Sequence, residues 1–318
     1  MNDLFGRIQS AQRALAPYLA PTPLVRSVLL SRLTGCEVYL KCEHQQQTGS
    51  FKARGATHKL LVLGEQARVG GVITASTGNH GQGVAWAGRM LDVPVTVYLP
   101  ENVSRYKLDV MNELGAEVVL VAGDPLLGEL EARREARRRG IPYVAPYNDL
   151  DVVAGQGTAG LEMTQQCADL DAVFVTVGGG GLMAGIGTAF KSASPRTRVV
   201  GAWPVASTCM YRSLDAGHIV SVEEAETLSD SSTGNLEPGS VTFEICKAVI
   251  DDRVLIDEPE IRAAMRLLAE NERWIVEGAA GVAFAGLLKH AATHPGQKLA
   301  AVVCGRNIML DKFMEAVR

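Results

Sequence analysis

The chain has 318 residues, of which 47% are hydrophobic and 21% are charged, and its formal net charge at pH 7 is −4. This length suits two α/β lobes or one large one. The slightly acidic balance argues against nucleic-acid and membrane-surface partners, which favour a basic excess, and leaves a small-molecule ligand as the expectation.

A helix is the first element that the sequence predicts. Leu4, Ile8, Ala11 and Leu15 recur at helical spacing and would share one buried face, and Asp3 would cap the helix. Short β-rich runs then alternate with glycines or helical patterns at residues 38–42, 71–74, 95–99, 118–121, 172–177, 199–203 and 301–304. Strands that alternate with helices predict parallel sheets with helices on both faces. We therefore expect an α/β fold that binds its ligand at the carboxyl ends of the strands.

A lysine-containing segment follows the first strand run. Residues 48–56 read Thr-Gly-Ser-Phe-Lys-Ala-Arg-Gly-Ala, which places Lys52 between an aromatic residue and a small one. A lysine in this setting is most often a solvated surface residue. The segment alone therefore does not predict a catalytic lysine.

Four consecutive glycines, at 178–181, join a predicted buried strand to a helical pattern at 182–193. Glycines let backbone N–H groups approach a phosphate, and the helix N-terminus adds a favourable dipole. A plain strand-to-helix turn is the alternative, but four glycines in a row cost much unfolded-state entropy. The loop therefore predicts a phosphate site.

The same loop fits a dinucleotide-binding fingerprint only loosely, through Gly179, Gly181 and Ala184. That fingerprint needs an acidic residue about 20 positions later for the ribose, and residues 199–205 hold none. A P-loop is excluded because no Gly-Lys-Ser/Thr follows. An NAD(P)-dependent oxidoreductase remains the alternative from a different class.

Together, the Lys52 segment and the glycine loop resemble the fold-type II pyridoxal-phosphate (PLP) enzymes, specifically the serine/threonine dehydratase and serine racemase family. Further family motifs occur in the family's order at 22–24 (Thr-Pro-Leu), 76–83 (Ser-Thr-Gly-Asn-His-Gly-Gln-Gly), 277–281 (Glu-Gly-Ala-Ala-Gly) and 304–307 (Cys-Gly-Arg-Asn). The resemblance implies the tryptophan synthase β-like fold, with two lobes of parallel-type twisted sheet flanked by helices and the cofactor between them.

The two lobes must be divided by chain crossings, because no low-complexity linker interrupts the sequence. Glycines near 64–71 and the stretch 146–149 are the best candidates for these crossings. We predict a small domain of residues 67–148 and a large cofactor-binding domain of residues 1–66 and 149–318.

The resemblance also assigns roles to individual residues. Lys52 would form the Schiff base with PLP and shuttle the Cα proton, which requires a depressed pKa. Phe51 would pack near the cofactor ring, and Asn79 would hydrogen-bond the ring hydroxyl. The cofactor phosphate would be bound by Gly178, Gly179, Gly180, Gly181 and Leu182. The substrate carboxylate would be gripped at a helix N-terminus by Ser76, Thr77, Gly78, Asn79 and His80.

Cys304 stands where the family usually has serine or threonine beside the pyridine nitrogen. A neutral thiol cannot hold a full proton on that nitrogen as a carboxylate would, so the ring would be a weaker electron sink. A weaker sink suits β-elimination and disfavours transamination. Packing at a buried strand end describes Cys304 equally well, and both roles are compatible.

Thr77 and His80 each have two interpretations. Thr77 stands where the racemase has a serine that serves the second face of Cα and where many dehydratases have alanine. Its hydroxyl could act as a catalytic acid or base, and its methyl group could instead narrow the site or pack. His80 could bind substrate or could pack at the helix end.

No divalent-metal site is expected at the family's usual place. Metal-activated relatives have a glutamate at the end of the strand at 199–203 and an aspartate some six residues later, and this chain has Trp203 and Cys209 there. A hard cation needs oxygen ligands. His290 and His294 are i,i+4 neighbours, but no third ligand is evident, so a solvent-facing pair is expected.

The stretch 227–239 is polar and contains glycine. Together with Gly-Ala-Trp-Pro at 201–204, it looks like a branch that includes the hydroxyectoine-utilisation dehydratases. The stretch could be a surface loop, but its length suits a substrate-side loop in a cleft. Glu237 would then be a partner for a substrate amine.

The predicted function is that of a PLP-dependent dehydratase, or ammonia-lyase. Such an enzyme converts a β-hydroxy amino acid such as L-threonine or L-serine to a 2-oxo acid and ammonia. There are three alternatives. The enzyme could racemise amino acids, or it could eliminate water from a hydroxylated diaminobutyrate-type substrate. The protein could also be a catalytically silent relative that only binds a ligand. The acid that protonates the leaving hydroxyl is not identified by the sequence.

The predicted location is the cytoplasm. The six cysteines are scattered without a Cys-x-x-Cys pair, and the N-terminus has neither a basic region nor a long apolar run. The family resemblance also implies a homodimer or a higher homo-oligomer.

Overall fold

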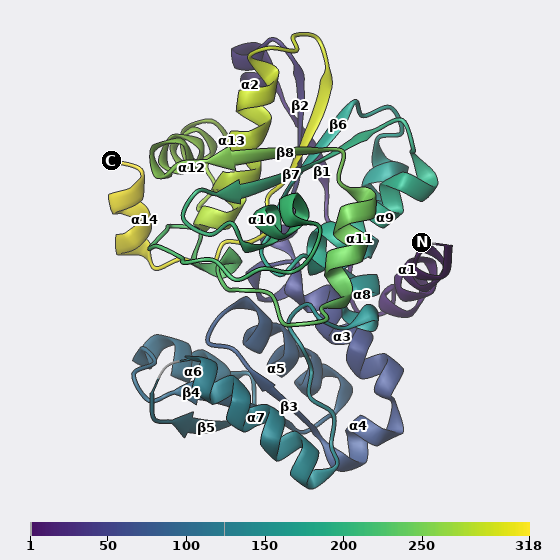
Figure 1. Ribbon diagram of the computed structural model, residues 1–318, viewed down its shortest axis with the longest axis vertical. Helices are drawn as coiled ribbons and strands as arrows, with labels where there is room; N and C mark the ends of the chain where they lie inside the picture. Colours follow the sequence, from purple (N-terminus) through teal and green to yellow (C-terminus); the bar gives the residue numbers. More distant parts are fainter. Residues whose placement is uncertain (1, 124) are drawn as a thin grey trace.

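The computed structural model describes residues 2–123 and 125–318, and the strands in these ranges form two sheets in two lobes (Figure 1). Within this described part, the larger sheet has six strands in the order β1-β2-β9-β6-β7-β8. The strand bounds are β1 Leu24–Ser27, β2 Glu37–Lys41, β6 Ala172–Thr176, β7 Arg198–Pro204, β8 Asp252–Ile256 and β9 Lys298–Val302. β1 pairs antiparallel with β2, and the other pairs are parallel.

The smaller sheet is all parallel, with the order β3-β4-β5. Its strands are β3 Val72–Ala75, β4 Val95–Pro100 and β5 Glu117–Val121. The helices around it are α4 Glu65–Gly70, α5 Asn79–Leu91, α6 Arg105–Glu113 and α7 Pro125–Arg139 (Figure 1).

Helices cover both faces of the larger sheet. The α-helices of this lobe are α1 Asn2–Leu15, α2 Val28–Thr34, α3 Lys52–Leu63, α8 Leu150–Gln166, α9 Gly181–Ala193, α10 Cys209–Ala216, α11 Val241–Val249, α12 Glu258–Glu272, α13 Gly278–Ala291 and α14 Leu310–Ala316. The short 3-10 helices are η1 Glu43–Gln45, η2 Gln47–Gly49 and η3 Asp230–Ser232. A Cβ at Gly286 of α13 would meet Ala202 of β7 at 3.3 Å, and one at Gly187 of α9 would meet Val199 of β7 at 3.6 Å. Because side chains alternate along a strand, α13 and α9 lie on opposite faces.

Close helix crossings bring the starts of α3 and α5 together. A Cβ at Gly83 of α5 would lie 3.1 Å from the backbone of Lys52, and one at Gly155 of α8 would lie 2.6 Å from the Cα of Gly55 in α3. Glycine leaves room for the backbones at both crossings. Lys52, the first residue of α3, therefore lies close to α5, which begins at Asn79.

The predicted α/β fold with two parallel-type sheets flanked by helices is confirmed, with β1 as an antiparallel edge strand. Each predicted strand run overlaps an observed strand, and the first helix buries the four apolar residues of its predicted face. The prediction that Asp3 caps this helix is wrong, because Asp3 lies inside the first turn, where its carboxylate pairs with Arg7. The domain boundaries at residues 67 and 148 stay a prediction.

Two strands were not predicted. β1 has four residues at the sheet edge, and β8 has a mixed pattern in which only Ile256 is fully buried. Neither segment therefore carries the apolar run that marks a buried central strand. In the ranges 2–123 and 125–318, none of the helices is long and apolar enough to cross a membrane.

Candidate active site

Lys52 begins α3 at the junction of the two lobes, with α5 beside it (Figure 1). Its Nζ donates a hydrogen bond of 2.8 Å to the carbonyl oxygen of Pro146. Burial lowers the pKa of Lys52 to about 8, although the neighbouring Glu277 and Cys304 act to raise it. An amine with this pKa is partly unprotonated near neutral pH, so it can act as a nucleophile or a base.

A buried network of charges fixes the start of α3. Arg54 donates from Nε to Glu43 at 2.7 Å and from Nη1 to Glu162 of α8 at 2.5 Å. Lys41, at the end of β2, completes the network with a 2.6 Å ion pair to Glu162. Breaking a buried ion pair on one side is strongly destabilising, because it leaves an unpaired buried charge. The network therefore holds the helix turn that carries Lys52, and sequence reasoning did not identify it.

Glu277 lies at the centre of the same region and is only 3% exposed. The amide nitrogen of Asn79 donates to both of its carboxylate oxygens, at 3.0 and 2.9 Å, and the Ser231 hydroxyl donates at 2.9 Å. The thiol sulfur of Cys304 lies 3.9 Å from Oε1. Burial raises the pKa of Glu277, while the hydrogen bonds from Asn79 and Ser231 act to lower it. Glu277 is named from the sequence only as part of the motif at 277–281 and is given no role there. The feature that could have identified it is a single acidic residue directly before a glycine-rich helix start.

The glycine loop joins β6 to α9 and has space only for backbone. A Cβ at Gly178 would lie 2.7 Å from the backbone of Ser232, one at Gly179 would lie 2.4 Å from the Tyr147 ring, and Gly180 has a φ of +83°. In the described part of the chain, the N–H groups of residues 178–181 take part in none of the loop or side-chain hydrogen bonds. Such free donors at a helix N-terminus suit a phosphate.

His80 is buried in the first turn of α5, the helix that packs beside α3. Its Nε2 lies 2.9 Å from the carbonyl oxygen of Val144, which can only accept, so Nε2 carries the ring proton. Burial, together with the positive charge of Lys52, lowers the pKa of His80 to about 3. His80 is therefore a neutral imidazole at working pH. Its Nδ1 has no hydrogen-bond partner among the residues that the structure describes.

Comparison with known proteins identifies the family. Residues 15–305 match the family model described as pyridoxal-phosphate dependent enzyme. The chain belongs to this family. It is 39% identical over 310 residues to the L-threonine ammonia-lyase of Thermotoga maritima, an alignment that covers 96% of this chain and 77% of the relative.

Two solved structures are similar to this protein over nearly the whole chain. The processed form of threonine deaminase isoform 2 from Solanum lycopersicum has a TM-score of 0.95 and 33% identity, over 99% of this chain and 92% of that one. The maize serine racemase has a TM-score of 0.92 and 27% identity, over 98% of this chain and 96% of that one. The cofactor is therefore PLP, and the dinucleotide interpretation of the glycine loop has no support.

The residues present fit PLP. The glycine loop offers a cradle that a Cβ would fill. Asn79 and Cys304 both contact Glu277, and Phe51 and Lys52 lie next to Cys304. The Phe51 ring centroid lies 5.3 Å from the Lys52 Nζ, and the Phe51 N–H donates to the Cys304 carbonyl at 3.1 Å. Burial and the nearby Glu277 carboxylate raise the pKa of Cys304 well above its ordinary value, so this side chain stays a neutral thiol.

The loop that precedes α5 contains three of the predicted substrate-binding residues. Ser76, Thr77 and Gly78 are partly exposed, and Gly78 is the N-cap of α5. The Gly78 N–H donates to the Ser76 hydroxyl at 3.2 Å. This places the loop next to Asn79 and leaves its surface accessible to a small molecule.

Among the described residues, Glu237 makes its polar contacts with Arg133, Asn148 and Tyr147 and forms no hydrogen bond or ion pair with Lys52 or Asn79. Its carboxylate pairs with Arg133 of α7 at 2.8 Å and accepts from the Asn148 amide at 3.0 Å, and its N–H donates to the Tyr147 hydroxyl. The predicted contact of Glu237 with a substrate amine stays a prediction.

The places considered for a metal hold no suitable ligand set. Trp203 is buried, and the Cys209 sulfur accepts from the Leu236 N–H at 3.2 Å. Across residues 2–123 and 125–318, no group of three or more His, Cys, Asp or Glu side chains could hold a metal ion.

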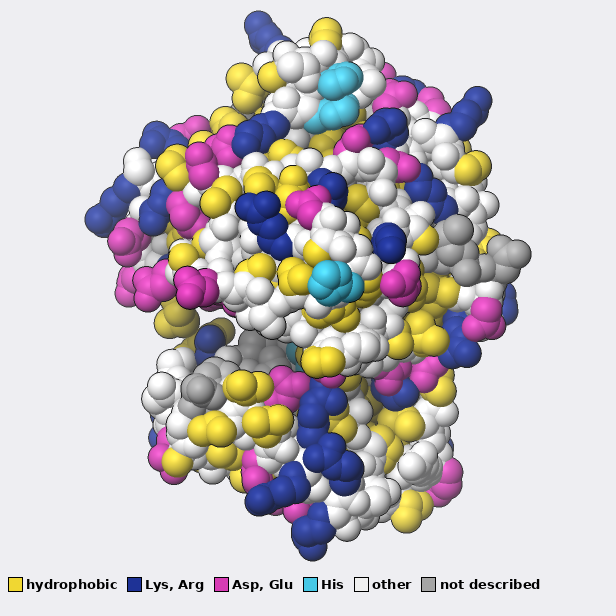
Figure 2. Space-filling model, viewed as in Figure 1, with side chains coloured by type: hydrophobic (Ala, Val, Ile, Leu, Met, Phe, Trp, Pro, Cys, Tyr) yellow, Lys and Arg dark blue, Asp and Glu magenta, His cyan; other side chains and the backbone are white. Residues whose placement is uncertain are grey.

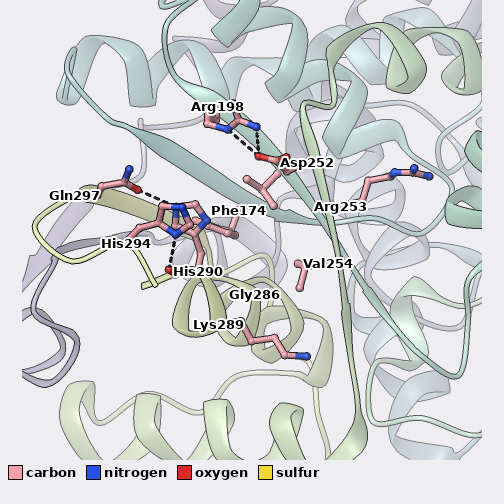
Figure 3. A pocket seen from close by; sticks show the side chains of 11 residues that line it. Phe174, Arg198, Asp252, Arg253, Val254, Gly286, Lys289, His290, His294 and Gln297 are labelled. Carbon is pink, nitrogen blue, oxygen red and sulfur yellow. Dashed lines mark hydrogen bonds and ion pairs between the residues drawn. The ribbon is translucent and has the colours of Figure 1, made fainter. Parts of the chain in front are cut away.

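The His290–His294 pair lines a separate cavity of about 520 Å³ on the larger lobe (Figure 3). The two rings stack 4.0 Å apart, and His290 is hydrogen-bonded to Gln297 at 2.8 Å. Arg198, on the same cavity wall, is paired with Asp252. None of the residues around Lys52 lines this cavity, so it is distinct from the candidate active site.

Proposed function

We propose that this PLP enzyme is a dehydratase that releases ammonia and a 2-oxo acid from a β-hydroxy amino acid, with L-threonine as the first candidate. The observation that carries the proposal is the Lys52 amine, whose pKa is lowered to about 8 beside residues that fit PLP. The similarity to an L-threonine ammonia-lyase and a threonine deaminase supports the choice of substrate.

PLP supplies the electron sink that makes the Cα proton of a bound amino acid removable. Lys52, the glycine loop, Asn79 and Cys304 would hold the cofactor. The Lys52 Nζ would take the Cα proton, and the Pro146 carbonyl, 2.8 Å away, orients this nitrogen. The N-terminus of α5, with Ser76, would bind the substrate carboxylate.

The neutral Cys304 thiol favours elimination. A thiol beside the pyridine nitrogen does not hold a full proton there, so negative charge at Cα is stabilised less than it would be by a carboxylate partner. A leaving group that departs promptly is then the favoured outcome, and this supports loss of the β-hydroxyl over transamination.

The test is a screen of β-hydroxy amino acids for 2-oxo acid release, with wild type and Lys52→Ala side by side. We expect release from L-threonine or L-serine by the wild type and none by Lys52→Ala. Turnover at the wild-type rate by a folded Lys52→Ala protein would contradict the proposal.

Two narrower alternatives enter the same screen. The Thr77 hydroxyl and the likeness to a serine racemase support a racemase side activity, which chiral analysis of unreacted serine measures. The likeness of residues 201–204 and 227–239 to the hydroxyectoine-utilisation dehydratases supports a hydroxylated diamino acid. A hydroxylated diaminobutyrate substrate therefore joins the panel.

We also propose that the protein is cytoplasmic and forms a homodimer or a higher homo-oligomer. All six cysteines are free thiols, which suits a reducing compartment.

Exposed apolar side chains on α2, namely Val28, Leu29 and Leu33, support a contact between two copies. Light scattering of the purified protein would measure the oligomeric state, and a monomer would contradict this assignment.

A further inference from the structure

Glu277 has contacts that the proposed chemistry does not yet use. Its carboxylate is buried between Asn79, Ser231 and Cys304, and Gly305 leaves the space that it occupies, because a Cβ there would lie 2.7 Å from Oε2. In the described part of the chain, no lysine or arginine forms an ion pair with it. A buried carboxylate held only by neutral donors is costly, which points to a role beyond packing.

The first consequence concerns the orientation of the Asn79 amide. A carboxylate only accepts, so the group that Asn79 turns toward Glu277 must be its NH2. On the other side, the Asn307 amide donates to the Asn79 carbonyl oxygen at 2.6 Å and to the Thr48 carbonyl at 2.7 Å. The two contacts allow one orientation of the amide. The NH2 group therefore points toward Glu277 and the carbonyl oxygen toward Asn307, and a variant that lets the amide turn over would exchange donor and acceptor at this place.

The second consequence concerns charge at Lys52. Glu277 lies near the start of α3: the N–H of Phe51, the neighbour of Lys52, donates to the Cys304 carbonyl at 3.1 Å, and the Cys304 sulfur lies 3.9 Å from Glu277 Oε1. At this place its negative charge opposes the effect of burial on the Lys52 amine. The hydrogen bonds from Asn79 and Ser231 favour the ionised form of Glu277. Burial acts the other way and raises the pKa of Glu277, so these hydrogen bonds are what favour its negative charge near the Lys52 nitrogen.

We propose that Glu277 is a positioning residue with two separable effects: its reach fixes the donor orientation of the Asn79 amide, and its charge stabilises the protonated Lys52 amine. The proposal rests on the proposed function for the contact between Asn79 and PLP. The effect on Lys52 is a property of the protein itself and does not depend on the reaction.

Two substitutions separate the effects. Glu277→Gln keeps the length of the side chain and removes its charge, whereas Glu277→Asp keeps the charge and shortens the reach. Glu272→Gln is the matched control, because Glu272 is a hydrogen-bonded carboxylate of the same lobe, paired with Ser27, that does not act on Lys52. Circular dichroism establishes that each variant is folded.

The charge is tested in full-length protein freed of PLP, by the rate at which an amine reagent labels Lys52 across pH. We expect Glu277→Gln to label about threefold faster than wild type at pH 7, because loss of the carboxylate lowers the pKa of Lys52. Glu277→Asp and Glu272→Gln should follow wild type. Equal labelling of Glu277→Gln and wild type would overturn this half.

The reach is tested by titration of PLP into wild type, Asn79→Ala, Glu277→Asp and the double variant. We expect Glu277→Asp to bind PLP about tenfold more weakly than wild type, as for loss of one hydrogen bond to a charged group. The double variant should bind PLP no more weakly than Asn79→Ala alone, because both changes remove the same contact. Additive losses, or unchanged binding by Glu277→Asp, would overturn the positioning role. If wild type bound PLP but eliminated nothing from the amino-acid panel, the proposed function would fail while both effects of Glu277 could still hold.

Discussion

Lys52 has a pKa of about 8 because burial outweighs the neighbouring Glu277 and Cys304. Only the unprotonated amine can attack the aldehyde of PLP. The rate of PLP uptake by the cofactor-free protein should therefore rise with pH, with its midpoint near 8, and should be about fivefold slower at pH 7 than at pH 8. Stopped-flow absorbance measures this rate. A midpoint near the ordinary value for lysine would show that burial does not control the amine.

Cys304 tests whether reaction choice depends on a neutral partner for the pyridine nitrogen. Cys304→Ser should keep elimination within about tenfold of wild type, or ~1.4 kcal/mol of barrier, because both side chains are neutral hydrogen-bonding groups. Cys304→Asp should eliminate less and should exchange the Cα proton more, because its carboxylate would stabilise a protonated ring.

The measurement is the ratio of deuterium uptake into unreacted substrate to release of 2-oxo acid, in folded variants loaded with PLP. An unchanged ratio in Cys304→Asp would mean that Cys304 only packs. Equal damage from Cys304→Ser would mean that shape at this position matters more than charge.

Among the elements, the glycine loop between β6 and α9 has little room for side chains. Gly179→Ala would place a Cβ 2.4 Å from the Tyr147 ring, so the loop or the ring must move. We expect PLP affinity to fall by about tenfold or more, because the phosphate donors would be displaced. Gly128→Ala in α7 is the matched control, since its Cβ would meet nothing within 4 Å. Binding of PLP by Gly179→Ala with wild-type affinity would argue against a phosphate role for the loop.

The elements that sequence patterns predicted are those with a strong local signal. β6 is buried along its whole length, and four glycines follow it after Val177, so both the strand and the loop could be placed. β1 and β8 are short or half-exposed and depend on pairing with a neighbouring strand, which the local sequence does not encode.

In the candidate site too, only residues with a local sequence signal could be predicted. Lys52 and the glycine loop lie in recognisable motifs. The role of Glu277 depends on its contacts with Asn79 and Cys304, which are distant in sequence. The ion-pair network around Arg54 joins segments more than one hundred residues apart, so no local pattern could have predicted it.

At the scale of the whole molecule, a loop of the larger lobe contacts the smaller one. Glu237 pairs with Arg133 of α7. Figure 2 shows Lys and Arg side chains gathered on the smaller lobe and a hollow between the two lobes at the left of the view. Glu237→Gln should increase amide hydrogen exchange in residues 227–240 and should change the stability of the chain by less than about 1 kcal/mol, because partly exposed pairs contribute little.

Glu131→Gln removes a more exposed ion pair from the same helix and serves as the control. It should leave exchange in residues 227–240 unchanged. Equal exchange in Glu237→Gln and wild type would show that Arg133 does not hold the loop.

The central claim is that Lys52 carries PLP and is the base of an elimination. Borohydride reduction of the purified protein, followed by peptide mass mapping, tests it most directly. We expect one cofactor-derived mass increment, on the peptide that contains Lys52, together with loss of 2-oxo acid release from L-threonine. An increment on another lysine, such as Lys41 or Lys59, or full activity after reduction, would contradict it.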